Sequence, residues 1–219
     1  KMAYEIKYRS EDEMKDSGIE WLEKIPRDWN KLNIGNIGYL GTSSVDKKIV
    51  ETEEEVFLLN YLDIYNNKSK TITNDINFMK VTARKSQIKA SQIKRGDVYF
   101  TPSSETSDDI GHSAVVIEDI ENTLFSYHLM RLSFNKCIDN QFKKYLFNNY
   151  FVLKQFSKKA NGTTRKTLTK DDFKYTNVLL PPISDQQKIA NFLDIKIAEF
   201  DSIISKKELL IEKLEEAKK

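Results

Sequence analysis

The chain has 219 residues, which is enough for one large domain or for one domain with an extension. Charged residues make up 31% of it, and no run approaches the roughly 18 consecutive apolar residues of a membrane helix. A single cysteine, Cys137, excludes an internal disulfide and favours a reducing compartment, so we expect a cytoplasmic protein with no membrane partner. Next to Ile138, Cys137 is expected to be a small core residue.

The first part of the chain predicts short strands behind an ordered lead-in. Trp21 and Trp29 flank Pro26, and two tryptophans are rarely placed in a disordered tail. The apolar run 56–64 is rich in β-branched and aromatic residues and ends at a turn signal, Asn66-Asn67, so it predicts a strand. Further short strands are expected at 96–101, 114–117, 130–134 and 177–180.

One helix is predicted among these strands. Asp139 is expected to cap a helix that runs from Asn140 to about Lys158, because apolar residues recur there at helical spacing. Asn161-Gly162 would end it. The sequence therefore predicts a mixed α/β (α+β) domain with a mixed sheet over residues 1–182, followed by a second unit over 183–219.

The second unit is predicted to be one long coiled-coil helix. Ser184 and Gln187 form a capping box, with Ser184 as the N-cap, and no Gly or Pro follows up to Lys219. Six apolar residues follow a 4-3-4-7-3 spacing, with Lys207 in the missing position: Leu193, Ile197, Phe200, Ile204, Ile211 and Leu214. We call these six residues the apolar stripe. Such a helix should pair with another helix; the alternative is a surface helix folded back on its own domain.

The net charge of +2 says little, but the charges are segregated along the chain. The windows 80–95 and 154–170 each carry six Lys or Arg residues and no Asp or Glu. Segregation of this kind can give a nearly neutral protein a basic face, which is typical of nucleic-acid binders; two solvated loops are the alternative.

Assembled catalytic motifs are missing from the sequence. There is no HExxH, CxxC, GxGxxG or phosphate-binding GK[ST] motif. The Pro181-Pro182 pair lies between Leu and Ile, unlike the Asn-Pro-Pro-aromatic loop of an amino-methyltransferase. The acidic and hydroxyl residues at 103–109 are expected to form a polar turn. We predict a non-catalytic chain without metal or cofactor; a nuclease with scattered carboxylates is the enzymatic alternative.

Four stretches together resemble the specificity subunit of type I restriction-modification systems. They keep the family's order and span nearly the whole chain, although Glu23 stands where the first motif usually has glycine. The stretches are Asp16–Trp29, Ile93–Phe100, Gly162–Leu168 with Asp172-Phe173, and Leu180–Asp194.

The resemblance implies a target-recognition domain that reads double-stranded DNA and performs no catalysis. Methyltransferase subunits would bind the helix and methylate adenine with S-adenosylmethionine, and a restriction subunit would use ATP and Mg²⁺. A complete member has two recognition domains and two long helices. This chain is therefore expected to be a half-subunit or a fragment whose helix pairs antiparallel with a second copy or a second half. A stand-alone coiled-coil-dimerising DNA-binding adaptor or regulator is the alternative.

The resemblance also implies that loops and a β-hairpin enter the major groove. Lys and Arg would neutralise phosphates, while Arg, Asn, Gln, Ser and Thr would read base edges. We predict contacts from three loop segments, with Arg84 and Arg165 as the leading base readers. The candidates are Thr42, Ser43, Ser44, Lys47 and Lys48; Arg84, Lys85, Ser86, Gln87 and Lys89; and Asn161, Thr163, Thr164, Arg165 and Lys166.

Overall fold

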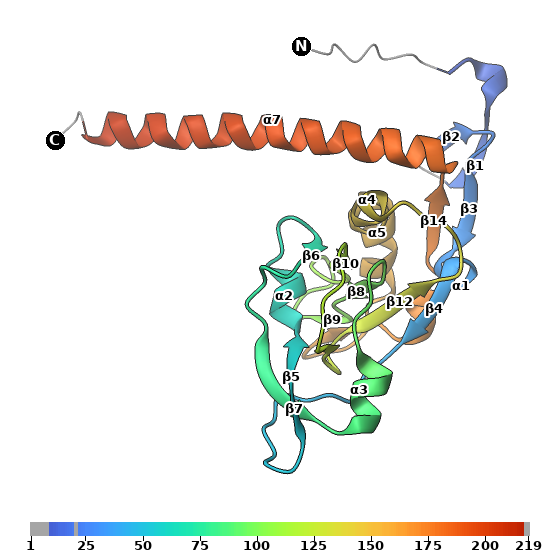
Figure 1. The fold of residues 1–219 in the computed structure, drawn as a ribbon. Helices are drawn as coiled ribbons and strands as arrows, with labels where there is room; N and C mark the ends of the chain where they lie inside the picture. Colours follow the sequence, from blue (N-terminus) through green and yellow to red (C-terminus); the bar gives the residue numbers. More distant parts are fainter. Residues whose placement is uncertain (1–8, 20–21, 217–219) are drawn as a thin grey trace.

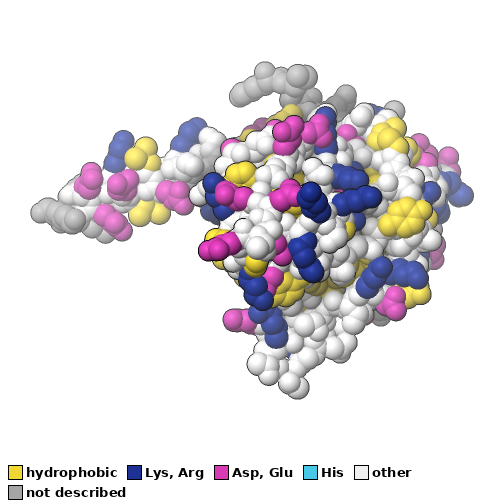
Figure 2. All heavy atoms as spheres, turned by 60° about the horizontal axis from the view of Figure 1, so that its bottom comes forward, with side chains coloured by type: hydrophobic (Ala, Val, Ile, Leu, Met, Phe, Trp, Pro, Cys, Tyr) yellow, Lys and Arg dark blue, Asp and Glu magenta, His cyan; other side chains and the backbone are white. Residues whose placement is uncertain are grey.

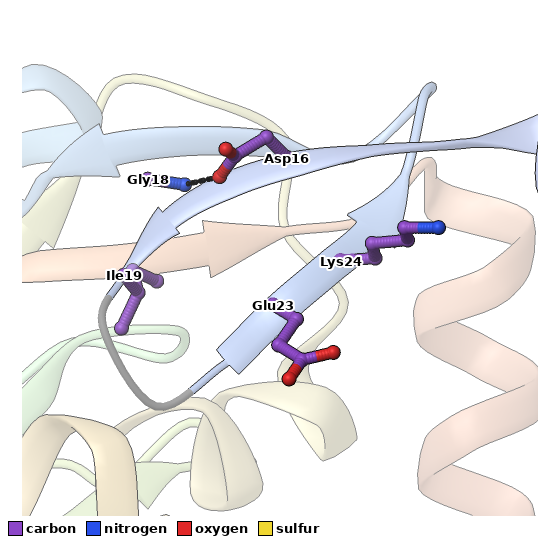
Figure 3. Close-up of a pocket in the computed structure, with 5 residues that line it drawn as sticks. All are labelled: Asp16, Gly18, Ile19, Glu23 and Lys24. Atoms are coloured by element: carbon purple, nitrogen blue, oxygen red, sulfur yellow. Dashed lines mark hydrogen bonds between the residues drawn. The ribbon is translucent and has the colours of Figure 1, made fainter.

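A computed structural model describes residues 9–19 and 22–216, which form a layered domain with one long helix extending from it (Figure 1). The lead-in is a short 3-10 turn and an antiparallel hairpin of β1 (Met14–Ile19) and β2 (Leu22–Pro26). Gly18, with φ of 63°, donates its N–H to Asp16 Oδ1 at 2.6 Å (Figure 3). Trp21 lies outside the described residues, so that part of the predicted lead-in stays a prediction.

The central sheet has five strands in the order β4-β12-β8-β10-β6. Its pairs are antiparallel except β10–β6, which is parallel. The strands are β4 (Gly38–Gly41), β12 (Met130–Phe134), β8 (Val98–Phe100), β10 (Ser113–Val116) and β6 (Thr71–Ile72).

Helices cover one face of this sheet and form the main core with it. They are α1 (Ile34–Ile37), α4 (Asn140–Asn148), α5 (Tyr150–Lys159) and α6 (Lys170–Lys174). Phe100 packs against Phe147 and Phe173 with ring centroids 5.2 Å apart in each pair, and Phe156 completes the buried cluster. Each such side chain stabilises the fold by roughly 1.5–3 kcal/mol on full burial.

A smaller sheet, in the order β11-β5-β7, lies beside the central one. It consists of β11 (Thr123–Phe125), β5 (Glu54–Leu59) and β7 (Met79–Ala83). The helices α2 (Tyr61–Tyr65) and α3 (Lys85–Ser91) follow β5 and β7. Two further antiparallel pairs join β9 (Ser103–Ser104) to β13 (Lys166–Thr167) and β3 (Asn30–Asn33) to β14 (Asn177–Leu180).

The mixed α/β prediction is confirmed, and strands lie where they were expected at 98–100, 113–116, 130–134 and 177–180. Two predicted elements are wrong in extent because an asparagine caps a new helix inside each. Asn60 Oδ1 accepts a hydrogen bond from Tyr61 N, so the strand expected over 56–64 ends at Leu59 and α2 begins. Asn149 Oδ1 accepts from Val152 N, which divides the helix expected over 140–158 into α4 and α5.

Two smaller predictions are also wrong. Cys137 is exposed rather than buried, because it lies in the turn before α4 while Ile138 supplies the core contact. The long helix α7 (Ile183–Glu216) begins before Ser184, the residue predicted as its N-cap. The Pro182 carbonyl accepts hydrogen bonds from the amides of Asp185 and Gln186, so Ser184 lies within the first turn rather than at the N-cap.

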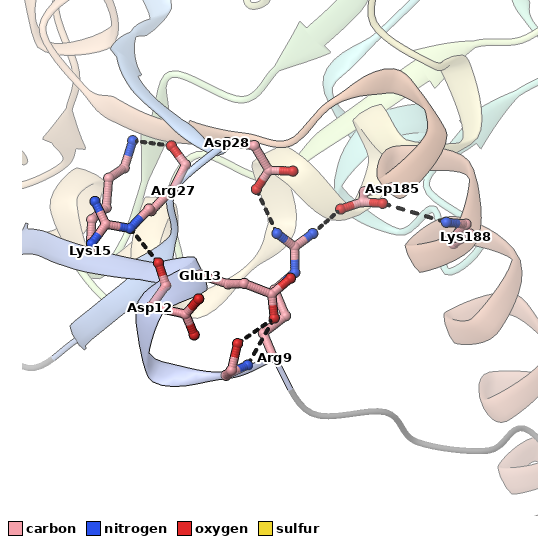
Figure 4. A network of polar contacts seen from close by, with 9 residues as sticks. Arg9, Asp12, Glu13, Lys15, Arg27, Asp28, Asp185 and Lys188 are labelled. Carbon is pink, nitrogen blue, oxygen red and sulfur yellow. Dashed lines mark hydrogen bonds and ion pairs between the residues drawn. The ribbon is translucent and has the colours of Figure 1, made fainter.

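The first turns of α7 are fastened to the domain by polar contacts. Gln186 is 2% exposed; its Oε1 accepts from Asp139 N and its Nε2 donates to the Pro181 carbonyl. Arg9 bridges Asp28 and Asp185 at 2.7 and 2.6 Å (Figure 4). Two turns later, Asp194 pairs with Lys144 Nζ of α4 at 2.6 Å. The direction of α7 is therefore fixed at its base.

The C-terminal part of α7 extends beyond the domain (Figure 1), and every residue from 199 to 216 is exposed. The last five members of the apolar stripe, from Ile197 to Leu214, have exposed fractions between 46% and 62%. The helix thus does not fold back over its own domain to bury the stripe. No described helix is long and apolar enough to cross a membrane.

Candidate DNA-binding surface

Two of the three predicted segments lie against each other, although about forty residues separate them in sequence. Gln87 Nε2 donates to the Ser44 carbonyl at 2.9 Å, and Ser43 Oγ donates to Ser91 Oγ at 2.9 Å. Thr82 N donates to the Lys48 carbonyl at 3.1 Å and continues this contact along β7. The segment 42–48 is thereby held beside α3.

The second segment is a helix and not the loop that was predicted. Arg84 is the N-cap of α3, and Gln87 Oε1 accepts from the Arg84 amide at 3.0 Å and from Arg84 Nε at 3.3 Å. The neighbouring strand β5 and its lead-in place carboxylates beside this helix. Glu53 Oε1 lies 3.9 Å from Arg84 Nε, and Glu54 Oε1 lies 4.0 Å from Lys85 Nζ. Acidic side chains therefore lie near the cations of a window that has no acid in sequence.

The third segment is a closed turn that leads into β13. Asn161 and Thr167 exchange two backbone hydrogen bonds of 3.1 and 2.8 Å. Gly162 has φ of 126°, and a Cβ there would collide with the carbonyl oxygen of Arg165, so the turn requires glycine. Lys166 Nζ donates to the Gly162 carbonyl at 2.7 Å, which gives this predicted phosphate contact a role inside the turn.

Arg165 projects from this turn toward strand β9 and helix α2. Its Nε donates to Ser103 Oγ at 3.1 Å, and its guanidinium carbon lies 5.8 Å from the centre of the Tyr61 ring, within cation–π range. The Tyr61 hydroxyl donates to the Ser103 carbonyl at 2.8 Å, so the tyrosine and the serine are themselves joined. Among the described residues, no carboxylate forms an ion pair with Arg165.

His128 lies within electrostatic range of charges from the first and third segments. Burial lowers the pKa of its imidazole, and the nearby charges of Lys47 and Arg165 lower it further, while Asp46 opposes them. The backbone brings His128 there because Val45 pairs with Ser126 as an isolated parallel bridge and Tyr127 N donates to the Val45 carbonyl at 3.0 Å. Lys47 and Arg165, from distant parts of the chain, therefore share one electrostatic environment.

Most of the predicted candidates are exposed side chains. On the face of the domain seen in Figure 2, lysine and arginine side chains are interspersed with acidic and hydrophobic ones. The exposed candidates are Thr42, Ser44, Lys47, Lys48, Arg84, Lys85, Ser86, Lys89, Asn161, Thr163, Thr164 and Arg165; Ser43, Gln87 and Lys166 are half-buried.

Several residues of this surface were missed by the sequence reasoning. Tyr127 is 47% exposed, and its ring centroid lies 3.8 Å from that of His128. Tyr61 was assigned to a strand, and Ser103 to a solvated turn. Their part in the surface depends on the β9–β13 pairing and on the Val45–Ser126 bridge, for which the local sequence carries no signal.

A hollow and a histidine–carboxylate contact lie outside the three segments. A hollow of about 490 Å³ on the β1–β2 hairpin is lined by Asp16, Gly18, Ile19, Glu23 and Lys24, remote in sequence from all three segments (Figure 3). The described residues contain no cluster of three or more His, Cys, Asp or Glu that could hold a metal ion. Asp109 instead bonds to His112 at 2.6 Å and to the Tyr65 hydroxyl at 2.5 Å.

A mixed α/β domain with exposed cations and a long helix that carries an exposed apolar stripe have the features of a binding module with a helical arm. The sequence profile of the type I restriction modification DNA specificity domain matches residues 24–213, so the chain belongs to that family. The family resemblance drawn from the four sequence stretches is thus confirmed.

Solved structures share the fold at low sequence identity. A chain from a structure that addresses complex assembly and conformational transition of the type I R-M system aligns with a TM-score of 0.58 and 15% identity over 88% of this chain. The HsdS subunit from Thermoanaerobacter tengcongensis aligns with a TM-score of 0.56 and 14% identity over 87% of this chain. The S subunit of a type I restriction-modification system from M. genitalium aligns with a TM-score of 0.51 and 14% identity over 81% of this chain.

This chain covers only 43%, 42% and 41% of those three proteins, respectively. No curated protein matches the chain by sequence.

Proposed function

We propose that the chain reads one half of a bipartite DNA target and directs adenine methyltransferase and restriction subunits to it. The observation that carries this proposal is the contact between the first two polar segments, where Gln87 Nε2 donates to the Ser44 carbonyl and Ser43 Oγ donates to Ser91 Oγ. Segments about forty residues apart thus form one exposed polar and basic surface, as a protein needs in order to contact phosphates and base edges together. Membership of the DNA specificity domain family supports the same function.

The proposed role is recognition without catalysis. S-adenosylmethionine, ATP and Mg²⁺ would be bound by the partner subunits, and the complex would act on DNA in the cytoplasm. This division fits the lack of a phosphate-binding or methyltransferase motif in the chain. Methyl transfer to DNA by the purified chain alone would contradict it.

We propose further that the apolar stripe of α7 pairs antiparallel with the same helix of a second copy or of a second half. Phe200, Ile204 and Ile211 are 62%, 52% and 56% exposed, and each would stabilise a pair by roughly 1.5–3 kcal/mol on full burial. An antiparallel pair places two recognition domains at opposite ends, which suits a target with two separated halves. Methyltransferase subunits would bind along the paired helices.

Selection from a library of randomised duplex DNA tests the recognition function. The chain should enrich a short motif, and Lys47→Ala combined with Arg165→Ala should lose that enrichment. Lys196→Ala on α7, which removes a lysine paired with Glu199 away from the surface, is the matched control. Failure of the unmutated chain to enrich any motif, alone or with a methyltransferase subunit, would overturn the proposed function.

Sedimentation tests the helix pairing. Ile204→Asp with Ile211→Asp should convert a dimer at tens of micromolar into a monomer and leave the domain folded, as circular dichroism can verify. Ser202→Asp with Ser205→Asp adds the same charge away from the stripe and should leave the dimer intact. A strictly monomeric unmutated chain would remove self-pairing and leave only a partner-dependent pairing.

A further inference from the structure

We propose that Arg165 reads a guanine in the major groove and that Tyr61 and Ser103 are its positioning residues. This inference rests on the proposed DNA-reading function and assigns one base contact within it. It also separates two arginines that the sequence treats alike, since Arg84 and Arg165 both lie in acid-free windows.

The Arg165 side chain is held before any ligand arrives. Ser103 Oγ accepts from Nε at 3.1 Å, the Tyr61 ring lies 5.8 Å from the guanidinium carbon, and the Tyr61 hydroxyl donates to the Ser103 carbonyl at 2.8 Å. Tyr61 is fixed in turn by α2, where its ring stacks on Tyr65 with centroids 5.6 Å apart. An arginine that is already ordered loses less conformational entropy when it binds a base.

The backbone beneath the side chain is also fixed. Lys166 pairs with Ser104 and Thr167 with Ser103, so the strand that follows Arg165 is joined to the strand that carries its hydrogen-bond acceptor. The turn before it is closed by the Asn161–Thr167 hydrogen bonds and by the left-handed Gly162. The guanidinium is thus placed by two adjacent strands and one helix.

The contacts that hold Arg165 leave its charge uncompensated. Serine and tyrosine are neutral partners, and in the described part of the chain no carboxylate lies within ion-pair distance of the guanidinium. Arg84 differs, since Glu53 lies 3.9 Å away and Gln87 accepts from its Nε. Of the two arginines, only Arg165 combines a fixed position with an unpaired charge.

Guanine is the base that this group fits. A guanidinium has five N–H donors in a planar fork, and guanine presents two acceptors, O6 and N7, in the major groove. Adenine offers a donor beside N7 and would oppose one of the two N–H groups. A phosphate could also accept the fork, but a phosphate contact would carry no base preference.

The test measures the affinity of the full chain for the motif selected as above and for a set in which each guanine is replaced in turn by adenine or by 7-deazaguanine. The unmutated chain should discriminate against replacement at one guanine by about 5- to 150-fold. Arg165→Ala and Arg165→Lys should lose discrimination at that guanine and keep discrimination at the other positions of the motif. Arg84→Ala should keep discrimination at the guanine assigned to Arg165.

The positioning residues are separated from a general structural effect by conservative variants. Tyr61→Leu removes the ring and should reduce discrimination at the same guanine, whereas Tyr61→Phe keeps the ring and should retain most of it. Ser103→Ala should also reduce discrimination at this guanine, but by less than Tyr61→Leu does. Thermal unfolding of each variant shows whether it remains folded.

Two outcomes would overturn the inference. One is an equal loss for Arg165→Ala on selected and random DNA, which would make Arg165 a phosphate contact. The other is an enriched motif in which no guanine depends on Arg165. Both leave the proposed function standing, whereas a chain that selects no motif removes the function itself.

Discussion

The two windows without acidic residues look equivalent in sequence but have different surroundings in the fold. In the first window, α3 lies beside β5, and Glu53 and Glu54 are close to Arg84 and Lys85. In the second, the turn at 161–167 lies beside β9 and α2, which present Ser103 and Tyr61 to Arg165. Strand pairing therefore places acidic side chains beside the first window and neutral side chains beside the second.

The difference shows that charge segregation along a chain does not ensure a basic surface in space. The acids at 51–55 follow the first polar loop in sequence, but β5 pairs antiparallel with β7 and places Glu54 opposite Ala83, directly before Arg84. The end of the 161–167 turn pairs instead with β9, a strand that consists of two serines. We therefore expect the second window to dominate base reading and the first to contribute weaker contacts.

The largest effect should come from breaking the second window's turn. Gly162→Val forces a β-branched residue into φ of 126° against the Arg165 carbonyl. Strain of this kind costs about 1–3 kcal/mol, and we expect the free energy of unfolding in urea to fall by that amount and selective DNA binding to be lost. Ser205→Val places the same side chain on an exposed position of α7, outside the candidate surface, and should change both quantities little. Equal effects of the two variants would show that the turn has no particular importance for DNA binding.

Single lysine substitutions should show a smaller contrast in salt dependence. Lys47 has no ion pair among the described residues, whereas Lys85 lies 4.0 Å from Glu54. If Lys47 neutralises one phosphate, Lys47→Ala should reduce the slope of log affinity against log salt by about 0.9. Lys85→Ala should reduce the slope by less. Fluorescence anisotropy over a salt series measures both, and a larger change for Lys85→Ala would reverse the comparison.

Removing the acidic side chains near the first window should make its contribution to DNA affinity more like that of the second window. Glu53→Gln with Glu54→Gln leaves Arg84 and Lys85 without nearby carboxylates, and we expect a gain of a few-fold in affinity for random DNA at low salt. The gain should vanish at high salt because exposed charges are screened. Glu208→Gln with Glu212→Gln on α7 changes the net charge equally and serves as the control. If this control gives the same gain, net charge alone explains the result.

The smallest effect concerns the titration of His128. Its folded-state pKa lies below the ordinary value of 6.5 because of burial and of Lys47 and Arg165. The unfolded chain therefore takes up the proton more readily, so this group's contribution to stability is complete above about pH 6.5 and is lost as pH falls below it. In an NMR titration, Lys47→Ala should raise the pKa of His128, and Lys89→Ala on α3 should not. An unchanged value in Lys47→Ala would place Lys47 outside the shared environment.

Local elements of the fold could be predicted because their signals are short-range. Asp139 caps α4 as expected, with its Oδ1 accepting from Phe142 N, and Pro181-Pro182 follows β14 where the strand was expected to end. The candidate segments were predicted from their composition and from the family resemblance, and their contacts with DNA stay a prediction. Their partners were not predicted, because the pairing of Glu54 with Ala83 and the bridge from Val45 to Ser126 join residues far apart in sequence. The helix at Tyr61 was missed because the apolar run around it hides the cap at Asn60.

The contacts at the base of α7 attach the helix rigidly to the domain, so that the two should move together. Gln186 and Asp194 fix its angle to the domain, and the 34 residues from Ile183 to Glu216 span about 51 Å. A tilt of about 10° at the base would move the far end by about 9 Å, nearly the diameter of the helix itself. A force that turns the far end is therefore delivered to α4 and the domain core instead of being absorbed by a flexible joint. The transmission of such a force depends on the buried side chain of Gln186, which joins the base of α7 to the domain.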